Sequence, residues 1–168
     1  MLESDEVQIM NKEFKECLLD VYLGEQAGEM IFESMLTMTE DESQRYIISN
    51  MLQLETEGKA IMRPLLVKLG IPIEENKPLR ERGIEIADTF RGMSFKEQFE
   101  NIYQSVKNYY LPQYEELATL VDEEDSDAFY IANFMGEHER SILLASENII
   151  KDRPNPVQPI RDILKFPI

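Results

Sequence analysis

The chain has 168 residues and a mass of 19.6 kDa, which suits one domain with a hydrophobic core and is too little for two. Its 33 acidic residues outnumber 17 basic ones, and the formal net charge of -16 opposes contact with nucleic acid or an anionic membrane surface. A single cysteine, Cys17, excludes an intrachain disulfide and favours a reducing compartment.

The amino terminus reads MLESDEVQIM and has neither the basic start nor the apolar run of a signal peptide. No segment approaches the ~20 consecutive apolar residues of a membrane span. We therefore expect a cytoplasmic protein with no membrane partner.

Apolar residues recur at spacings of three and four along most of the chain, and strict alternation is nearly absent, which predicts an all-α protein. We expect one domain, residues 1–168, with helices over about residues 5–38, 41–69, 94–121 and 126–150. The tail, residues 151–168, has four prolines and is expected to wrap the end of the bundle.

Local signals mark the predicted helix ends. Thr39 with Glu42, and Ser94 with Glu97, have the spacing of capping boxes, and Ser126 is a candidate cap for the fourth helix. Two prolines inside helices, at positions 64 and 112, predict local kinks because each removes a backbone donor.

The connections predict how the helices are arranged. Only a few polar residues separate the first helix from the second and the third from the fourth, so each pair should form an antiparallel hairpin. Gly70 ends the second helix, and the 24 residues from Gly70 to Met93 are long enough to return along the bundle. This pattern favours a four-helix bundle with a long crossover between its second and third helices.

Every α-helix rises by the same distance per residue, so the number of residues between a polar side chain and its hairpin gives the depth of that side chain in the bundle. Glu25 lies about 14 residues before the first hairpin and Glu55 about 15 after it. Counting residues from the second hairpin in the same way places Tyr110 at the same depth as Glu139, whose neighbour in the sequence is His138. These five side chains are expected in one layer across the middle of the bundle.

Three buried carboxylates near one another are costly unless protons or a cation accompany them. Carboxylates with an imidazole suit iron, manganese or zinc, and helix bundles are known to hold paired irons with inward-pointing glutamates. The predicted metal ligands are Glu25, Glu55, His138 and Glu139.

At these residues the chain resembles the ferritin-like superfamily of di-iron carboxylate proteins. The resemblance covers roughly residues 8–150 and depends on the crossover and on three segments, YLGEQAGEMIFESML, LQLETEGKAIM and FMGEHERSILLASE. It implies one glutamate and one Glu-x-x-His unit from the first helix pair, and the same set from the second pair.

The chain departs from that ligand pattern at three positions. Gly58 stands where the first histidine is expected, Tyr110 where a glutamate is expected, and Ile142 where the second histidine is expected. Three of the six implied ligands remain, so the implied site is degenerate or atypical. His138 does not restore the pattern, although it could donate to the same cavity.

Each candidate ligand also has a purely structural explanation. Glu55 has the spacing of a surface ion pair with Lys59, and Glu139 could belong to a solvated charge run with Arg140. His138, the single histidine, is more often a satisfied core residue than a ligand. A carboxylate between two glycines could mark a close approach of two helices, and the tyrosines of the third helix could simply fill the core.

Three functions follow from this pattern. The first is an iron-dependent oxidoreductase that activates oxygen or oxidises ferrous iron, with Tyr110 as an electron or proton donor. The second is a non-catalytic bundle that lost its metal and serves as a binding or oligomerisation module. The third is a helical oxygenase of haem-oxygenase-like architecture. A small-molecule or oxygen substrate is expected, and the nine methionines would suit a homodimer face.

Overall fold

The computed structural model describes residues 2–168, with side chains from Lys12 onward. Within that range the chain is helical without any strand, which confirms the all-α prediction. The elements are α1 (Leu2–Met38), α2 (Glu42–Lys68), α3 (Lys77–Asp88), α4 (Phe95–Ser105), the π-helical segment η1 (Val106–Tyr110), α5 (Leu111–Thr119), α6 (Ser126–Ile150) and α7 (Gln158–Arg161). None of these helices is both long and apolar enough to cross a lipid bilayer.

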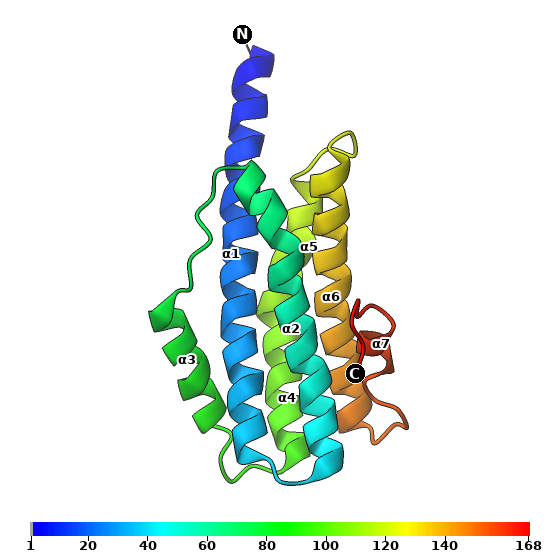
Figure 1. Cartoon of the computed structure of the whole chain (residues 1–168). Coiled ribbons are helices and arrows are strands. Elements are labelled where there is room, and N and C mark those ends of the chain that lie inside the picture. Colours follow the sequence, from blue (N-terminus) through cyan, green and yellow to red (C-terminus); the bar gives the residue numbers. More distant parts are fainter. Residues whose placement is uncertain (1) are drawn as a thin grey trace.

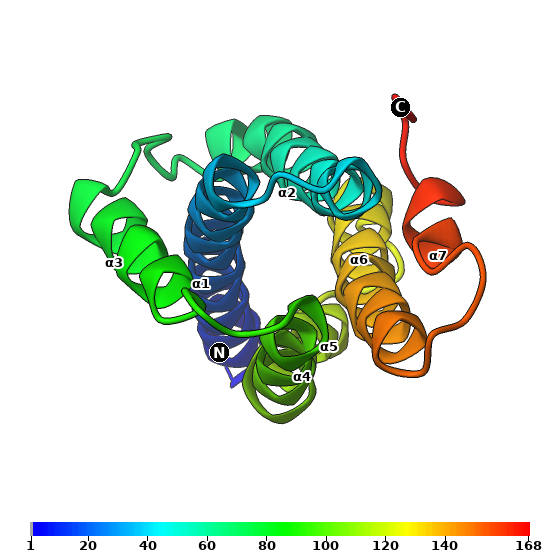
Figure 2. The same ribbon diagram turned by 90° about the horizontal axis from the view of Figure 1, so that it is seen from below.

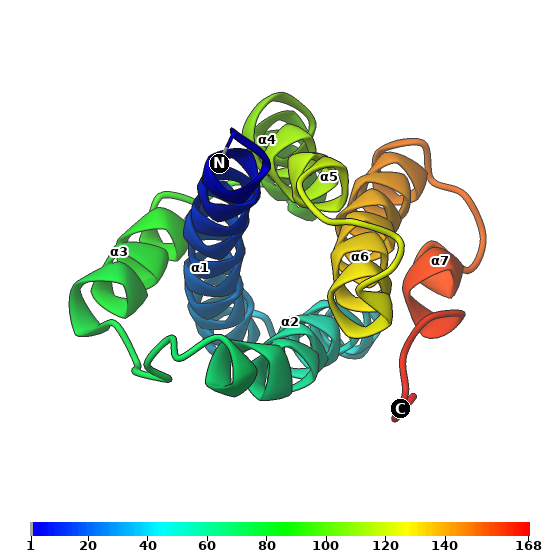
Figure 3. The same ribbon diagram turned by 90° about the horizontal axis from the view of Figure 1, so that it is seen from above.

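Four helical columns surround a common interior. Figures 2 and 3 show α1, α2, α6 and the column formed by α4, η1 and α5 around the centre, while α3 and α7 lie outside them. In Figure 1, α1 and α2 run in opposite directions, and α2 and the α4–α5 column run in the same direction. The connection between α2 and α4 passes back along the outside of α1 and contains α3, which contacts α1.

The buried apolar side chains form two clusters, one towards each end of the columns. The first cluster takes Phe32 and Met35 from α1, and the second takes Leu18 and Val21. The helices α2 and α6 divide in the same way, because each contributes one run of apolar residues to each cluster. Residues 25, 55, 138 and 139 fall in the gaps between these runs, so the candidate ligands occupy the level between two apolar clusters.

The helix caps differ from the prediction at two of three places. Asp41 rather than Thr39 caps α2, and Asp125 rather than Ser126 caps α6, each accepting a hydrogen bond from a backbone N–H three residues on. Both predictions were wrong because each helix begins directly after the aspartate, whose charge also suits the helix N-terminus. The capping box predicted at Ser94 is confirmed.

Proline affects the two long columns differently. Helix α2 continues through Pro64 without interruption. The third predicted helix instead divides into α4, η1 and α5, and the π-helical segment ends two residues before Pro112. Proline cannot donate a backbone hydrogen bond to residue 108, so the backbone of the preceding turn has to find another bonding pattern.

A partly buried polar network attaches the long connection to α1 and α2. The ammonium of Lys59, on a side chain only 4% exposed, lies 3.1 Å from Oε1 of Glu29 and 2.6 Å from Oε1 of Glu75. The guanidinium of Arg80 lies 3.2 Å from each of the same two carboxylates. Side chains of α1, α2 and the connection therefore share one set of charges.

The tail lies along the side of α6 and α2 (Figure 1), whereas the sequence predicted that it wraps the end of the bundle. The carboxylate of Glu57 is 5% exposed and accepts hydrogen bonds from the backbone N–H groups of Lys165, at 2.6 Å, and Phe166, at 2.8 Å. A buried acceptor on α2 with two backbone donors gives the tail a specific place to attach.

Candidate metal centre

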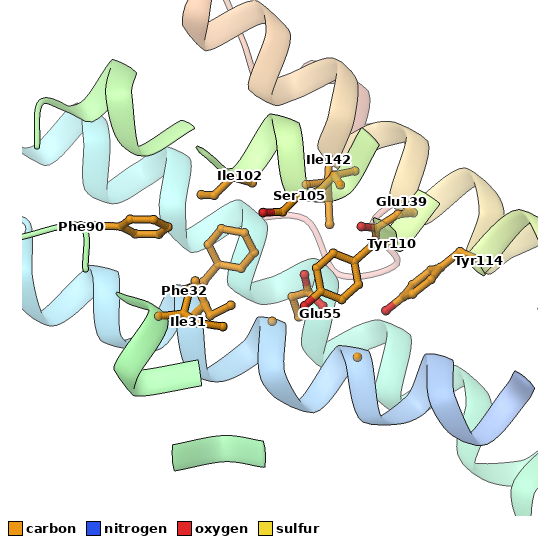
Figure 4. Close-up of a pocket in the computed structure, with 14 residues that line it drawn as sticks. Ile31, Phe32, Glu55, Phe90, Ile102, Ser105, Tyr110, Tyr114, Glu139 and Ile142 are labelled. Carbon is orange, nitrogen blue, oxygen red and sulfur yellow. The ribbon is translucent and has the colours of Figure 1, made fainter. Parts of the chain in front are cut away.

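The four predicted metal ligands come together inside the columns. Glu25 comes from α1, Glu55 from α2, and His138 and Glu139 from α6, and none of the four is more than 5% exposed. One ligand atom from each of Glu25, His138 and Glu139 lies within 4.8 Å of the others. Glu55 and Glu139 both line the cavity shown in Figure 4.

The imidazole of His138 lies between two carboxylates. Its Nε2 is 2.9 Å from Oε2 of Glu25, and its Nδ1 is 3.5 Å from Oε2 of Glu139. These contacts are close but poorly aligned, because neither ring nitrogen nor Oε2 of Glu25 makes a hydrogen bond of good geometry to any described residue. Buried polar atoms in this condition are uncommon and call for a proton, a water or an ion.

Glycines make room for this cluster on the neighbouring helices. A Cβ at Gly58 would overlap Oε2 of Glu25 and lie 3.1 Å from Nε2 of His138, and a Cβ at Gly28 would lie 2.6 Å from the Glu55 carboxylate. The Glu25 carboxylate therefore fits only because residue 58 has no side chain.

Tyr114 is the site residue that the sequence interpretation missed. Its hydroxyl donates a hydrogen bond to Oε1 of Glu25 at 2.6 Å, and its ring stacks on His138 with centroids 6.1 Å apart. The hydroxyl would lie 2.7 Å from a Cβ at Gly24, so this contact too depends on a glycine. Tyr110, the predicted donor, instead lines the cavity beside Glu55 (Figure 4).

The connection between α5 and α6 explains this difference. Helix α5 ends at Thr119 and α6 begins at Ser126, so residues 120–125 are not helical. Equal rise per residue, which was assumed in comparing depths about this hairpin, does not hold there. The polar run DEEDSD, residues 122–127, was the available signal, since such runs favour loops.

Burial and nearby charges shift the pKa values in the cluster towards the protonated forms. Burial, and then the Glu25 charge, raise the pKa of Glu55 well above its usual range, and burial raises that of Glu139. Burial alone would lower the pKa of His138, but Glu25 and its neighbouring carboxylates together raise it well above the usual value. Burial and the Glu25 charge also raise the pKa of Tyr114, which keeps its hydroxyl a donor.

Glu55 and Glu139 do not form the surface ion pairs with Lys59 and Arg140 that could have explained them without a metal. Lys59 pairs with carboxylates of α1 and the long connection rather than with Glu55. Arg140 lies 2.9 Å from Oε1 of Glu115, whereas Glu139 points into the interior. Neither glutamate belongs to a solvated surface pair.

A cavity of about 90 Å³ adjoins the cluster. Figure 4 shows polar side chains at one end of it and apolar side chains at the other. The polar end is formed by Glu55, Tyr110, Tyr114 and Glu139, the apolar end includes Ile31, Phe32, Phe90 and Ile102, and Ile142 lies between the two ends.

Comparison of the chain with family models, with curated proteins and with solved structures gave no match in any of the three.

Proposed function

We propose that this protein is a ferritin-like four-helix bundle with an atypical iron–carboxylate site that serves an oxidation reaction. The arrangement of four columns with a long external connection between the second and third supports the ferritin-like architecture. The donor set of carboxylates and one imidazole supports a divalent metal such as iron, with manganese or zinc as further candidates.

The observation that carries the proposal is the unsatisfied His138 ring beside Glu25. A buried imidazole nitrogen 2.9 Å from a carboxylate oxygen, with poor hydrogen-bond alignment, would bring two ligand atoms to a shared cation once that nitrogen gives up its proton. Glu25, His138 and Glu139 would hold that ion, and Glu55 would add a further carboxyl group. His138 adjoins the space above Gly58, so its imidazole can stand in for the histidine that the superfamily pattern has there.

The residues around the site suit oxidation chemistry. Bound iron would supply oxygen binding and one-electron redox chemistry. Tyr114 is placed to hold or give a proton at Oε1 of Glu25. The two apolar clusters on either side keep bulk water away from these groups.

A second candidate function is a metal-free binding or oligomerisation module. The raised pKa values of Glu55 and His138 favour it, because a proton on each group would partly neutralise the cluster without any ion. Metal titration distinguishes the two candidate functions, because the iron–carboxylate site should bind ferrous iron saturably and the metal-free module should not bind it.

The test is anaerobic calorimetric titration of ferrous iron into chelator-treated protein, with folding checked by circular dichroism. We expect saturable binding in the wild type and at least a tenfold loss of affinity in His138→Gln and Glu25→Gln. Glu137→Gln is the matched control, because Glu137 adjoins His138 in sequence but is exposed. A folded wild type that binds no iron, or a His138→Gln protein that binds it equally well, would reject the metal site in favour of the second candidate.

A further inference from the structure

The side chains that line the cavity beside the metal-site residues determine which kind of ligand fits there. We propose that it binds a small, mainly apolar molecule with an uncharged polar end, such as a short primary alcohol, with that end against Glu55 and Glu139. Describing this molecule as a substrate depends on the proposed oxidation function, whereas its binding does not.

The walls of the cavity are apolar over most of their length. Phe32 of α1, Ile102 of α4 and Ile142 of α6 are each at most 8% exposed and face the same space from three helices. An apolar cavity of this kind favours hydrocarbon over water, since water needs two or more polar partners that these side chains do not provide.

The polar end determines the charge of the ligand. Among the described residues that line the cavity, two are glutamates and none is lysine, arginine or histidine. A carboxylate ligand would therefore be repelled without any compensating cation from the chain. A charged end of either sign would also lose its hydration in this buried space, whereas a hydroxyl can both donate and accept hydrogen bonds, so an uncharged hydroxyl is the polar end that fits.

The size and opening of the cavity limit the ligand further. A volume of about 90 Å³ is smaller than the roughly 150 Å³ that accommodates benzene in an engineered protein cavity, so about four non-hydrogen atoms fit inside. Ser105 lines the cavity and is exposed, which places an opening beside α4. A longer molecule could extend outward there.

The π-helical segment contributes to this wall. Val106 and Tyr110, its first and last residues, both line the cavity, and Gly24 and Gly28 of α1 do so as well. Side chains at the two glycines would meet Tyr114 and Glu55. The cavity is thus bounded by an irregular turn and by bare backbone, two features that ordinary helix packing does not require.

The test uses 1-butanol, butyrate and butylamine as probes of equal chain length. Each is titrated into zinc-loaded and metal-free protein labelled at the isoleucine methyl groups, with chemical shifts followed by NMR and zinc content measured in each sample. We expect 1-butanol to shift the Ile102 and Ile142 methyls saturably, with a Kd of about 1 mM, and butyrate to bind at least tenfold more weakly.

Two matched variants separate binding in the cavity from general effects on folding. Ile102→Phe should fill the cavity and abolish butanol binding, whereas Ile131→Phe should keep it, because Ile131 is equally buried, at 8% exposed, but lies in the other apolar cluster. Ile142→Ala should enlarge the cavity and favour 1-hexanol over 1-butanol, which keeps the test decisive if Ile102→Phe does not fold.

The outcomes separate this proposal from the metal site. Zinc binding without saturable butanol shifts would overturn the cavity proposal alone. Butanol binding with no zinc uptake would support the cavity and reject the metal site. Equal or tighter binding of butyrate, or tighter binding of butylamine to the zinc-loaded protein, would overturn the uncharged polar end.

Discussion

At the scale of single residues, the polar cluster depends on the absence of side chains opposite it. The hydroxyl of Tyr114 fits against Gly24, the carboxylate of Glu55 against Gly28, and the carboxylate of Glu25 against Gly58. Each glycine costs the helix about 0.5 to 1 kcal/mol relative to alanine. That cost is consistent with a site, since a purely structural core would gain from alanine at all three positions.

The proton held by Glu55 leads to a prediction about pH. Because burial and Glu25 raise the pKa of Glu55 above 4.5, the folded chain keeps a proton that the unfolded chain releases above about pH 4.5. This group therefore makes the metal-free protein less stable as pH rises from 4.5 to its folded-state pKa. Glutamine cannot ionise, so Glu55→Gln should gain stability over the wild type through that window, with a slope of at most about 1.4 kcal/mol per pH unit.

Urea unfolding with chelator present, repeated across that pH range, measures this difference. Glu137→Gln is again the control, because it makes the same substitution at an exposed position of α6 outside the cluster. A Glu55→Gln advantage that stays constant or shrinks with rising pH would contradict a proton on Glu55.

At the scale of elements, the π-helical segment sets the register between the two regular pieces of the third column. Helix α4 and helix α5 are separate regular pieces, and η1 between them holds one residue more than a regular turn of similar height. Tyr114 and Leu117 face inward after it, and Phe99 and Ile102 face inward before it. The extra residue therefore changes the register between the two pieces without moving either from the interior.

Deletion of one residue should affect η1 and α4 in opposite ways. Removing exposed Asn108 should turn η1 into a regular turn, keep the fold and the contact between Tyr114 and Glu25, and close part of the cavity wall. Removing exposed Gln104 from α4 should rotate the inward face and cost several kcal/mol, because the buried apolar side chains on one side would turn away.

Thermal unfolding and butanol titration of both deletion variants measure these effects. We expect a Tm near that of the wild type and weaker butanol binding for the Asn108 deletion, and a much lower Tm for the Gln104 deletion. Equal destabilisation by the two deletions would show that η1 is not a removable insertion.

At the scale of the whole molecule, the long connection is held by charges rather than by apolar contacts alone. Lys59 of α2 joins Glu29 of α1 to Glu75 of the connection, and Arg80 of α3 joins the same two carboxylates. Burial alone would raise the pKa of Glu29, but hydrogen bonds from Thr56 and Lys59 lower it on balance. This network fixes the connection against the outside of α1.

Lys59→Met should destabilise the protein by about 1 to 3 kcal/mol, because it leaves half-buried carboxylates without their nearest cation. Since the folded-state pKa of Glu29 is lowered, its contribution is present above about pH 4.5 and is lost as pH falls through that lower pKa. The effect of Lys59→Met should therefore diminish in acid, and the double variant with Glu29→Gln should recover part of the loss.

Urea unfolding of these variants, with hydrogen exchange over residues 71–76, measures both the global and the local effect. Lys68→Met in the same helix is the control, because the Lys68 side chain is 56% exposed and its ion pair with Asp125 should contribute little. Equal losses for the two lysines would mean that the network does not hold the connection.

The sequence by itself determined the four long helical segments, their approximate ends and the shared depth of Glu25, Glu55 and Glu139. These properties are local or additive, since apolar periodicity identifies the buried face and a constant rise converts residue number into height. For the same reason His138 was found together with Glu139, although it lies outside the ligand pattern of the superfamily.

The tertiary structure alone decided the partners of these residues. Tyr114 rather than Tyr110 contacts Glu25 because residues 120–125 between α5 and α6 are not helical, which a constant rise cannot anticipate. Lys59 turns towards the long connection rather than Glu55 because Glu75 lies there, and the cavity exists because glycines bring bare backbone to its wall. Side-chain direction and the close approach of helices depend on contacts far apart in the chain, which no local pattern records.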